Sequence, residues 1–113
     1  MTTIFGKIVR GEIPCDKVYE DERCLAFNDV NPTAPVHVLV IPKTELRNLN
    51  AVDDSHAELL GHLLVVARKV AELKGISQSG YRVVANTEAG AGQSVFHLHL
   101  HVIGGRALDW PPG

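Results

Sequence analysis

The chain has 113 residues, of which 45% are hydrophobic and 21% are charged. This length supports one hydrophobic core rather than two, and the ordinary charge content argues against a disordered chain. The 11 basic and 13 acidic residues give a formal net charge of -2, which excludes a nucleic-acid-binding protein that relies on bulk positive charge. A small anion held by local groups remains compatible with this balance.

The cysteine count and the apolar segments indicate the compartment. The two cysteines, Cys15 and Cys24, form no CxxC pair and no disulfide framework. Residues 1–7 lack the apolar segment of a signal peptide, and no apolar run approaches the ~18 residues that span a membrane. We therefore expect a single domain over residues 1–113 in a reducing, cytoplasmic setting, with neither a nucleic acid nor a membrane as its partner.

The elements expected before residue 43 are short. A helix begins after Thr3, a residue type that caps helices, and ends at Val9, because its apolar residues recur at helical spacing. Strands are expected at residues 18–20, 24–27 and 36–41. In the third of these, which Pro42 ends, alternation places one set of side chains on the same face: His37, Leu39 and Ile41.

The clearest helix covers Asp53 to Leu73. Ser55 and Glu58 have the spacing of a capping box. An apolar stripe at helical spacing runs along it: Leu59, Leu63, Val66, Val70 and Leu73. His56 and His62 lie off this stripe, and we interpret them as histidines that face solvent or the rim of the core.

Two further strands are expected at residues 81–85 and 96–103. The glycine-rich loop 86–94 that joins them is short, which favours an antiparallel pair. Several strands with one segregated long helix predict an α+β fold. We expect an antiparallel sheet of about five strands, with one long helix and a short N-terminal helix.

Three of the six histidines lie within five consecutive residues. Side chains alternate between the faces of a strand, so His97, His99 and His101 would share one face. The opposite face, toward the core, would be apolar: Phe96, Leu98, Leu100 and Val102. Adjacent imidazolium rings repel one another, so three in a row favour a functional site over three surface histidines of purely structural origin.

Two kinds of chemistry fit this run. Same-face residues of a strand are ~6.7 Å apart, so the outer two histidines are ~13 Å apart at Cα, too far for all three to share one zinc ion easily. Two of them could still bind zinc together with His37 or a cysteine. In the other reading, a neutral imidazole attacks phosphorus and a charged neighbour protonates the leaving group. His99 has a histidine on each side and is the candidate nucleophile.

The loop before the run favours a phosphate ligand. Its glycines leave backbone N–H groups available, and Gln93 and Ser94 add donors where the loop meets the histidines. Successive backbone amides in such a turn can form an anion-binding nest.

The run from His97 to Ile103 resembles the His-φ-His-φ-His-φ-φ signature of the histidine triad family, in which φ is apolar. The resemblance covers nearly the whole chain and favours the Hint branch of the family. It includes residues 4–8, 12–14, 24–27, 37–43, 92–95, 104–106 and 110–113.

The resemblance implies a hydrolase that cleaves the P–N bond of purine nucleoside phosphoramidates, and also aminoacyl adenylates, and releases AMP or GMP. His99 would form a covalent nucleotidyl-histidine. His101 would contact the phosphate and protonate the amine, while His97 and His37 orient and tune the nucleophile. No cofactor or metal is implied. The sheet would continue across a homodimer. A non-catalytic nucleotide-binding regulatory module and a zinc-dependent protein are the alternatives.

The resemblance also implies nucleotide contacts. Asp29 would accept the ribose hydroxyls beside Asn28, where some animal members carry a histidine. The phosphate oxygens or the leaving group would be held by Asn86, Gln93 and Ser94. The base would occupy an apolar slot formed by Ile4, Phe5, Ile8, Phe27 and Leu39. Trp110 would reach toward the active site of the partner subunit.

Overall fold

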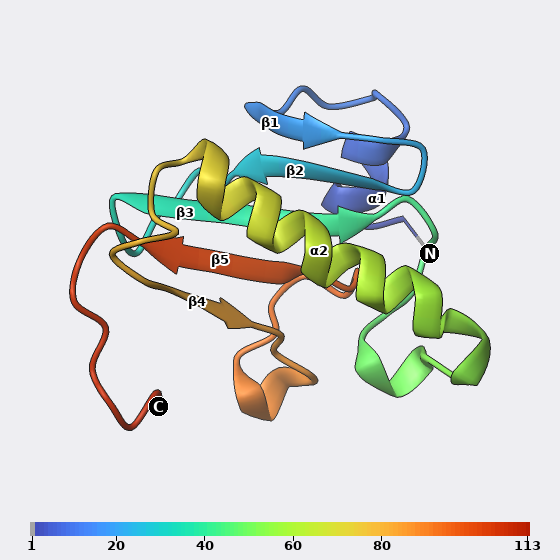
Figure 1. Cartoon of the computed structure of the whole chain (residues 1–113). Coiled ribbons are helices and arrows are strands. Elements are labelled where there is room, and N and C mark those ends of the chain that lie inside the picture. Colours follow the sequence, from blue (N-terminus) through green and yellow to red (C-terminus); the bar gives the residue numbers. More distant parts are fainter. Residues whose placement is uncertain (1) are drawn as a thin grey trace.

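A computed structural model describes residues 2–113, so Met1 of the N-terminal segment considered above lies outside the described residues. Five strands form one antiparallel sheet in the order β1-β2-β3-β5-β4 (Figure 1). The helices are α1 (Ile4–Val9) and α2 (Ala57–Leu73), and the strands are β1 (Lys17–Glu20), β2 (Cys24–Asn28), β3 (Val36–Pro42), β4 (Tyr81–Val84) and β5 (Leu100–Gly104). Three short 3-10 turns cover Leu49–Ala51, Asp54–His56 and Ala89–Ala91.

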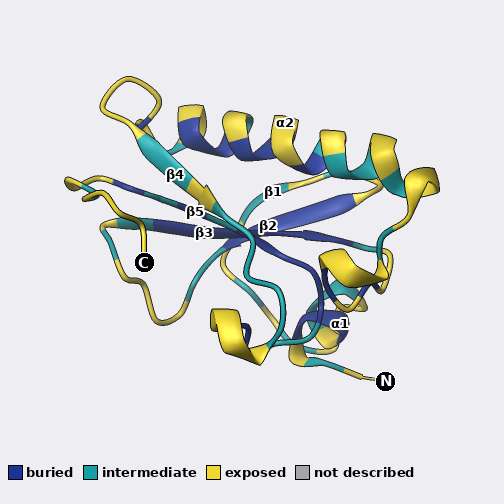
Figure 2. Ribbon diagram, turned by 90° about the horizontal axis from the view of Figure 1, so that it is seen from below, coloured by how far each residue is buried: buried dark blue, intermediate teal, exposed yellow. Residues whose placement is uncertain are grey.

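The two helices lie on opposite faces of the sheet. Figure 2 shows α2 along one face and α1 below the other, with the buried residues concentrated between the layers. The larger apolar cluster packs α2 against the sheet and includes Val38, Val40, Leu63, Val66, Val70, Leu98, Leu100 and Val102. A smaller cluster lies on the α1 side and contains Phe5, Leu25, Phe27, Leu39 and Ile41. The α+β prediction is therefore confirmed, as is the alternation predicted for β3.

The last strand is shorter than predicted, because it begins at Leu100 rather than at residue 96. The β3–β5 register pairs Val40 with Leu100, so its continuation would place Pro42 opposite Leu98. Proline has no N–H group and cannot extend the ladder. The N–H of Leu98 instead donates to the carbonyl of Leu46 at 2.6 Å. His97 and His99 therefore precede the strand.

The long helix also begins later than predicted. The segment from Asp54 to His56 is a 3-10 turn, and α2 starts at Ala57. The capping box is formed by Asp53 and His56, not by Ser55 and Glu58: the Asp53 carboxylate accepts the Ser55 N–H at 2.8 Å, and the His56 Nδ1 accepts the Asp53 N–H at 3.1 Å. The residue whose carboxylate reaches the free backbone N–H groups decides where the helix is capped.

The buried face of α2 differs from the predicted stripe at its end. Leu73 is 63% exposed, whereas two alanines, Ala67 and Ala71, are buried. Gly75, with φ of 73°, follows the helix in the left-handed conformation that ends many helices. Within residues 2–113, no helix combines the length and apolar character needed to cross a membrane.

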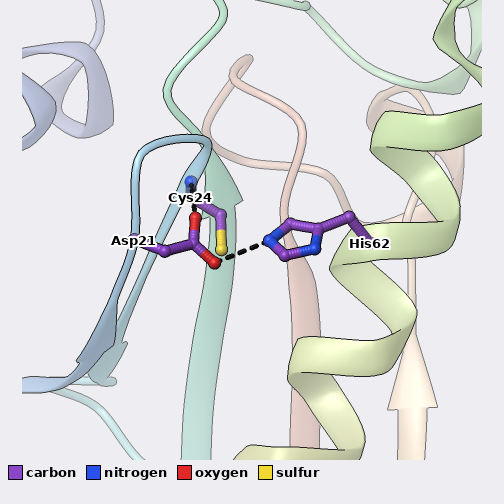
Figure 3. Close-up of side chains that lie close together, drawn as sticks. All are labelled: Asp21, Cys24 and His62. Carbon is purple, nitrogen blue, oxygen red and sulfur yellow. Dashed lines mark hydrogen bonds and ion pairs between the residues drawn. The ribbon is translucent and has the colours of Figure 1, made fainter.

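His62 joins α2 to the turn between β1 and β2, so it does not face solvent as a free side chain. Figure 3 shows its ring directed at Asp21, with the Cys24 side chain beside them. The Arg23 guanidinium only donates, so the Nδ1 of His62 accepts from it at 3.1 Å. The Nε2–H of His62 therefore donates to the Asp21 Oδ2 at 2.6 Å. This contact pins the hairpin to the helix.

Candidate active site

Four histidines meet on the face of the sheet that carries α1. The Nε2 of His37, on β3, lies 2.8 Å from the Nδ1 of His101, on β5. The ring of His99 is edge-on to that of His101, with centroids 4.9 Å apart, and it also meets Phe5 of α1 at 5.1 Å. His97 lies on the same side, with its ring centroid 6.4 Å from that of Phe5. The structure thus brings together all four predicted catalytic side chains.

A backbone donor fixes the proton on His37. The Thr33 N–H donates to the Nδ1 of His37 at 3.1 Å, so this nitrogen carries a lone pair. The proton of the neutral ring is therefore on Nε2, which donates to the Nδ1 of His101. The same Nε2 lies 3.4 Å from the Asp29 carboxylate. In neutral His101 the proton must then be on Nε2, the nitrogen that faces away from His37.

The environment keeps His101 neutral near pH 7. Burial, together with the neighbouring rings of His99 and His37, lowers the pKa of His101 to about 4. Within the described chain its Nε2 has no hydrogen-bond partner. Every buried side-chain nitrogen or oxygen among residues 2–113 does have one, so this Nε2 is not fully buried.

In His99 the proton is on the other ring nitrogen from that in His101. Its Nδ1 lies 2.7 Å from the carbonyl oxygen of His97, which can only accept, so Nδ1 carries the proton and Nε2 carries the lone pair. Burial lowers the pKa of His99 below its ordinary value, which keeps this lone pair free near neutral pH. His99 is only 6% exposed, but its Nε2 has no partner within residues 2–113 and, by the same reasoning, is not fully buried.

The side chain of His97 does not touch the ring of His99 through a hydrogen bond. Its Nε2 pairs with the carbonyl of Pro42 at 2.8 Å, and the residue is 2% exposed. The group that orients His99 is the backbone carbonyl of His97. We expected His97 to orient the nucleophile without specifying the group, and its contact with His99 is made by the main chain. Thr33 and Pro42 were missed, because they also act through main-chain groups that carry no side-chain signal.

The two residues expected at the ribose already have partners in the chain. The Oδ1 of Asp29 accepts the Asn31 N–H at 2.9 Å, and its Oδ2 faces His37. Asn28 donates from Nδ2 to the Asp16 carboxylate at 2.9 Å. Asp29 follows β2 and faces His37, so it connects the predicted sugar contact to the histidine pair, whereas the Asn28 side chain turns to Asp16.

Most residues predicted for the apolar slot lie together in a buried cluster. Phe5, Phe27 and Leu39 form one buried cluster, and Ile8 packs against it. Leu25, Ile41 and Val95 belong to the same group and were not predicted. Ile4 is 52% exposed and lies at its margin. This buried cluster borders His99 through Phe5.

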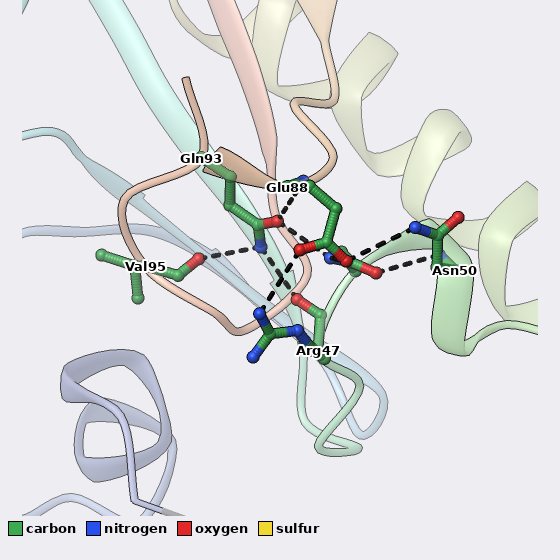
Figure 4. Close-up of polar contacts among 6 residues, drawn as sticks. Arg47, Asn50, Glu88, Gln93 and Val95 are labelled. Atoms are coloured by element: carbon green, nitrogen blue, oxygen red, sulfur yellow. Dashed lines mark hydrogen bonds and ion pairs between the residues drawn. The ribbon is translucent and has the colours of Figure 1, made fainter. Parts of the chain in front are cut away.

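The residues expected to hold phosphate fall into two groups. Gln93 is buried, and its amide makes four hydrogen bonds within the chain, which Figure 4 shows. Its side chain therefore shapes the loop and has no donor left for a phosphate. Ser94 and Asn86 make no side-chain hydrogen bond within the described residues, and Ser94 is exposed.

Two predicted contacts lie apart from the histidines. Trp110 is 83% exposed at the C-terminal tail. Its expected contact with a partner's site remains a prediction. Phe96 was expected to face the core, but it is only half-buried, and the Arg47 guanidinium stacks on its ring at 4.0 Å.

Two clusters contain metal-ligating residue types: Asp29, His37 and His101, and Asp21, Cys24 and His62. A histidine that binds a metal through Nε2 carries its proton on Nδ1 and donates it to an acceptor. The Nδ1 of His37 instead faces the Thr33 N–H, and that of His62 faces a guanidinium. Both arrangements place donor against donor if a metal binds, so they fit proton networks better than metal sites.

Known proteins resemble this chain over nearly its whole length. An uncharacterized HIT-like protein of Synechococcus elongatus is 57% identical over 98% of this chain and 96% of its own length. A protein of Zea mays named as a 14 kDa zinc-binding protein is 51% identical over 98% of this chain and 88% of its own length.

Solved structures show the same architecture. A HIT family hydrolase from Legionella pneumophila superposes with a TM-score of 0.97 at 48% identity, covering 99% of this chain and 100% of that chain. A HIT family hydrolase from Clostridium thermocellum gives a TM-score of 0.93 at 45% identity, covering 96% of this chain and 94% of that chain. The sequence also matches the HIT domain over residues 10–108, and the chain therefore belongs to the HIT domain family.

Proposed function

We propose that this protein is a hydrolase of the Hint type that cleaves the P–N bond of purine nucleoside phosphoramidates. One observation carries the proposal: His99 has a lone pair on Nε2, and its ring is edge-on to that of His101, whose Nε2 carries an N–H. A nucleophile beside a group that can move a proton is what this cleavage requires. Solved relatives named as HIT family hydrolases support a hydrolase.

The first step would be attack of the His99 Nε2 on the phosphorus. The imidazole gains positive charge as the N–P bond forms, and the carbonyl of His97 stabilises that charge through the Nδ1–H at 2.7 Å. The apolar surface around Phe5 would hold the base while the attack proceeds. The product of this step is a nucleotidyl-histidine.

The leaving amine needs a proton, since an amide anion is a poor leaving group. An incoming phosphate brings negative charge next to His101 and would raise the pKa of that ring, so it could bind as the imidazolium. Its Nε2–H would then pass to the amine nitrogen as the P–N bond breaks. The new Nδ1–H of His101 would face the Nε2–H of His37, so the two rings would have to move slightly apart, with His37 turning its Nε2–H to the Asp29 carboxylate, which lies 3.4 Å away in the resting structure.

Water would complete the cycle. Neutral His101 would take a proton from the water that attacks phosphorus, and the bond to the His99 Nε2 would break. The nucleoside monophosphate leaves, and both rings regain their starting protonation. All steps use groups of this chain alone.

The decisive experiment measures hydrolysis of an adenosine phosphoramidate by wild type and by His99→Ala. We expect turnover in the wild type and its loss in the variant, with AMP binding retained. Rapid quenching and mass spectrometry should detect a covalent AMP adduct on the wild type only. His56→Gln, a change at an exposed cap that Gln can replace, is the control and should leave turnover unchanged. Full activity of His99→Ala would refute the proposal.

The same assay separates the alternative, a nucleotide-binding regulatory module. Such a protein would bind AMP saturably but show no turnover and no adduct. The maize relative named as zinc-binding keeps a zinc-dependent protein open to test, and a chelator in the assay decides it.

A further inference from the structure

The loop before the histidines contains a residue in an unusual backbone conformation. Glu88 has φ of 72° and ψ of 164°. This region is adopted almost only by glycine, because a Cβ atom is strained there. Glycines stand nearby at positions 90 and 92, so the loop tolerates glycine. A glutamate at the strained position indicates that its side chain is needed.

The Glu88 carboxylate receives donors from the loop that follows β3. The Nδ2 of Asn48 donates to it at 3.0 Å, the Nδ2 of Asn50 at 3.4 Å, and the guanidinium of Arg47 at 3.3 Å (Figure 4). These three contacts hold the pKa of Glu88 below its ordinary value, so the carboxylate is ionised near neutral pH. The carboxylate thus connects two loops that lie forty residues apart in the sequence.

Asn48 links the Glu88 carboxylate to the side chain of Gln93. It is fully buried, and its amide has two N–H groups: one donates to Glu88 and the other to the Oε1 of Gln93 at 3.0 Å. Its Oδ1 accepts the Asn50 N–H at 3.0 Å. An acceptor on both sides leaves one orientation for the amide, and a buried N–H without an acceptor would be unfavourable.

Gln93 completes the chain of contacts toward the histidines. Its Oε1 also accepts the Glu88 N–H at 2.8 Å, so the Nε2 must point the other way. The Nε2 donates to the carbonyls of Arg47 at 2.9 Å and Val95 at 3.1 Å. Two residues beyond Val95 is the carbonyl of His97, which orients the nucleophile candidate.

We propose that Glu88 is a positioning residue of the active site. Its carboxylate fixes the amide of Asn48 and through it the amide of Gln93, which holds residues 94–97 and with them the His97 carbonyl that orients His99. Glu88 touches no reacting atom. The inference rests on the proposed hydrolysis, whose failure shows independently as a lack of wild-type turnover.

Two substitutions at one position test this. Glu88→Gln keeps an acceptor for Asn48, whereas Glu88→Gly removes it but relieves the backbone strain. We expect kcat to fall roughly ten- to a hundredfold in Glu88→Gly, because small displacements of reacting groups have effects of this size. Glu88→Gln should stay within about threefold, since misplacement rather than charge governs the effect. The thermal midpoint of Glu88→Gly should not fall in parallel.

A double-mutant cycle tests whether Glu88 acts through Asn48. If Glu88 acts through Asn48, Glu88→Gly should add little further loss of kcat in an Asn48→Leu background. Additive losses would overturn the route. Turnover of Glu88→Gly within twofold of wild type would overturn the inference itself, whether or not the double variant folds.

If the wild type shows no turnover, AMP affinity decides the inference instead. Glu88→Gly should then weaken AMP binding roughly fivefold or more, since misplaced phosphate donors have effects of this order, while Glu88→Gln should not. Equal affinities of the three proteins would overturn it.

Discussion

The pH dependence of stability tests the environment assigned to His101. Its pKa is about 4 in the fold and 6.5 in an unperturbed histidine. Below pH 6.5 this histidine binds a proton in the unfolded chain but stays neutral in the folded protein until the pH nears 4. The free energy of unfolding must therefore fall as the pH falls toward 4. This pKa difference corresponds to about 3 kcal/mol in total, of which about 2 kcal/mol is lost between pH 7 and pH 5.

The measurement is urea denaturation of wild type and His101→Asn at pH 7 and at pH 5. Asparagine does not titrate, so the variant should lose about 2 kcal/mol less than the wild type over this interval. The distant carboxylates remain in both proteins, so their contributions cancel, and the difference reports on His101 together with its effect on the adjacent ring of His99. Equal losses in the two proteins would refute the reasoning, whatever the absolute stability of the variant.

Further substitutions test the packing and the mechanism. Leu63→Ala truncates a side chain of α2 that is 1% exposed, and it should lower the free energy of unfolding by about 2–5 kcal/mol in urea denaturation. Leu64→Ala, at a side chain of the same helix that is 56% exposed, should change it by less than about 0.5 kcal/mol. Gly105→Ala should cost about 1–3 kcal/mol, because φ is 87° and the new Cβ would lie 3.0 Å from that of Pro35; Gly90→Ala, with open space around it, should be close to neutral. Phosphoramidate turnover should persist in EDTA, and loss of activity that zinc restores would contradict the proposed mechanism.

Local patterns were sufficient for most of the fold. The β-branched run of β3 and the Thr3 cap of α1 were predicted because short-range preferences and tertiary packing agree there. The alternation rule also placed His99 and His101 on one face correctly. The start of β5 was predicted too early, because it depends on Pro42, which lies far from it in the sequence.

The site was predicted by residue type but not by contact. Gln93 was expected to bind phosphate, since an amide beside glycines is a common anion ligand. Its actual partners, Asn48 and the carbonyl of Arg47, belong to a loop that sequence alone does not bring near. Glu88 carried no signal either, because a positive φ at a glutamate is visible only in three dimensions.

The proton positions in the histidine array depend at both ends on peptide groups: the Thr33 amide and the His97 carbonyl. A peptide group is present whichever codon stands at its position, so no ordinary substitution except proline at position 33 can delete either one. The path of the backbone therefore determines the tautomers of His37 and His99. An engineer who redesigns the walls of this pocket for a new leaving group can change many side chains and still retain a ring nitrogen with its lone pair directed at the ligand.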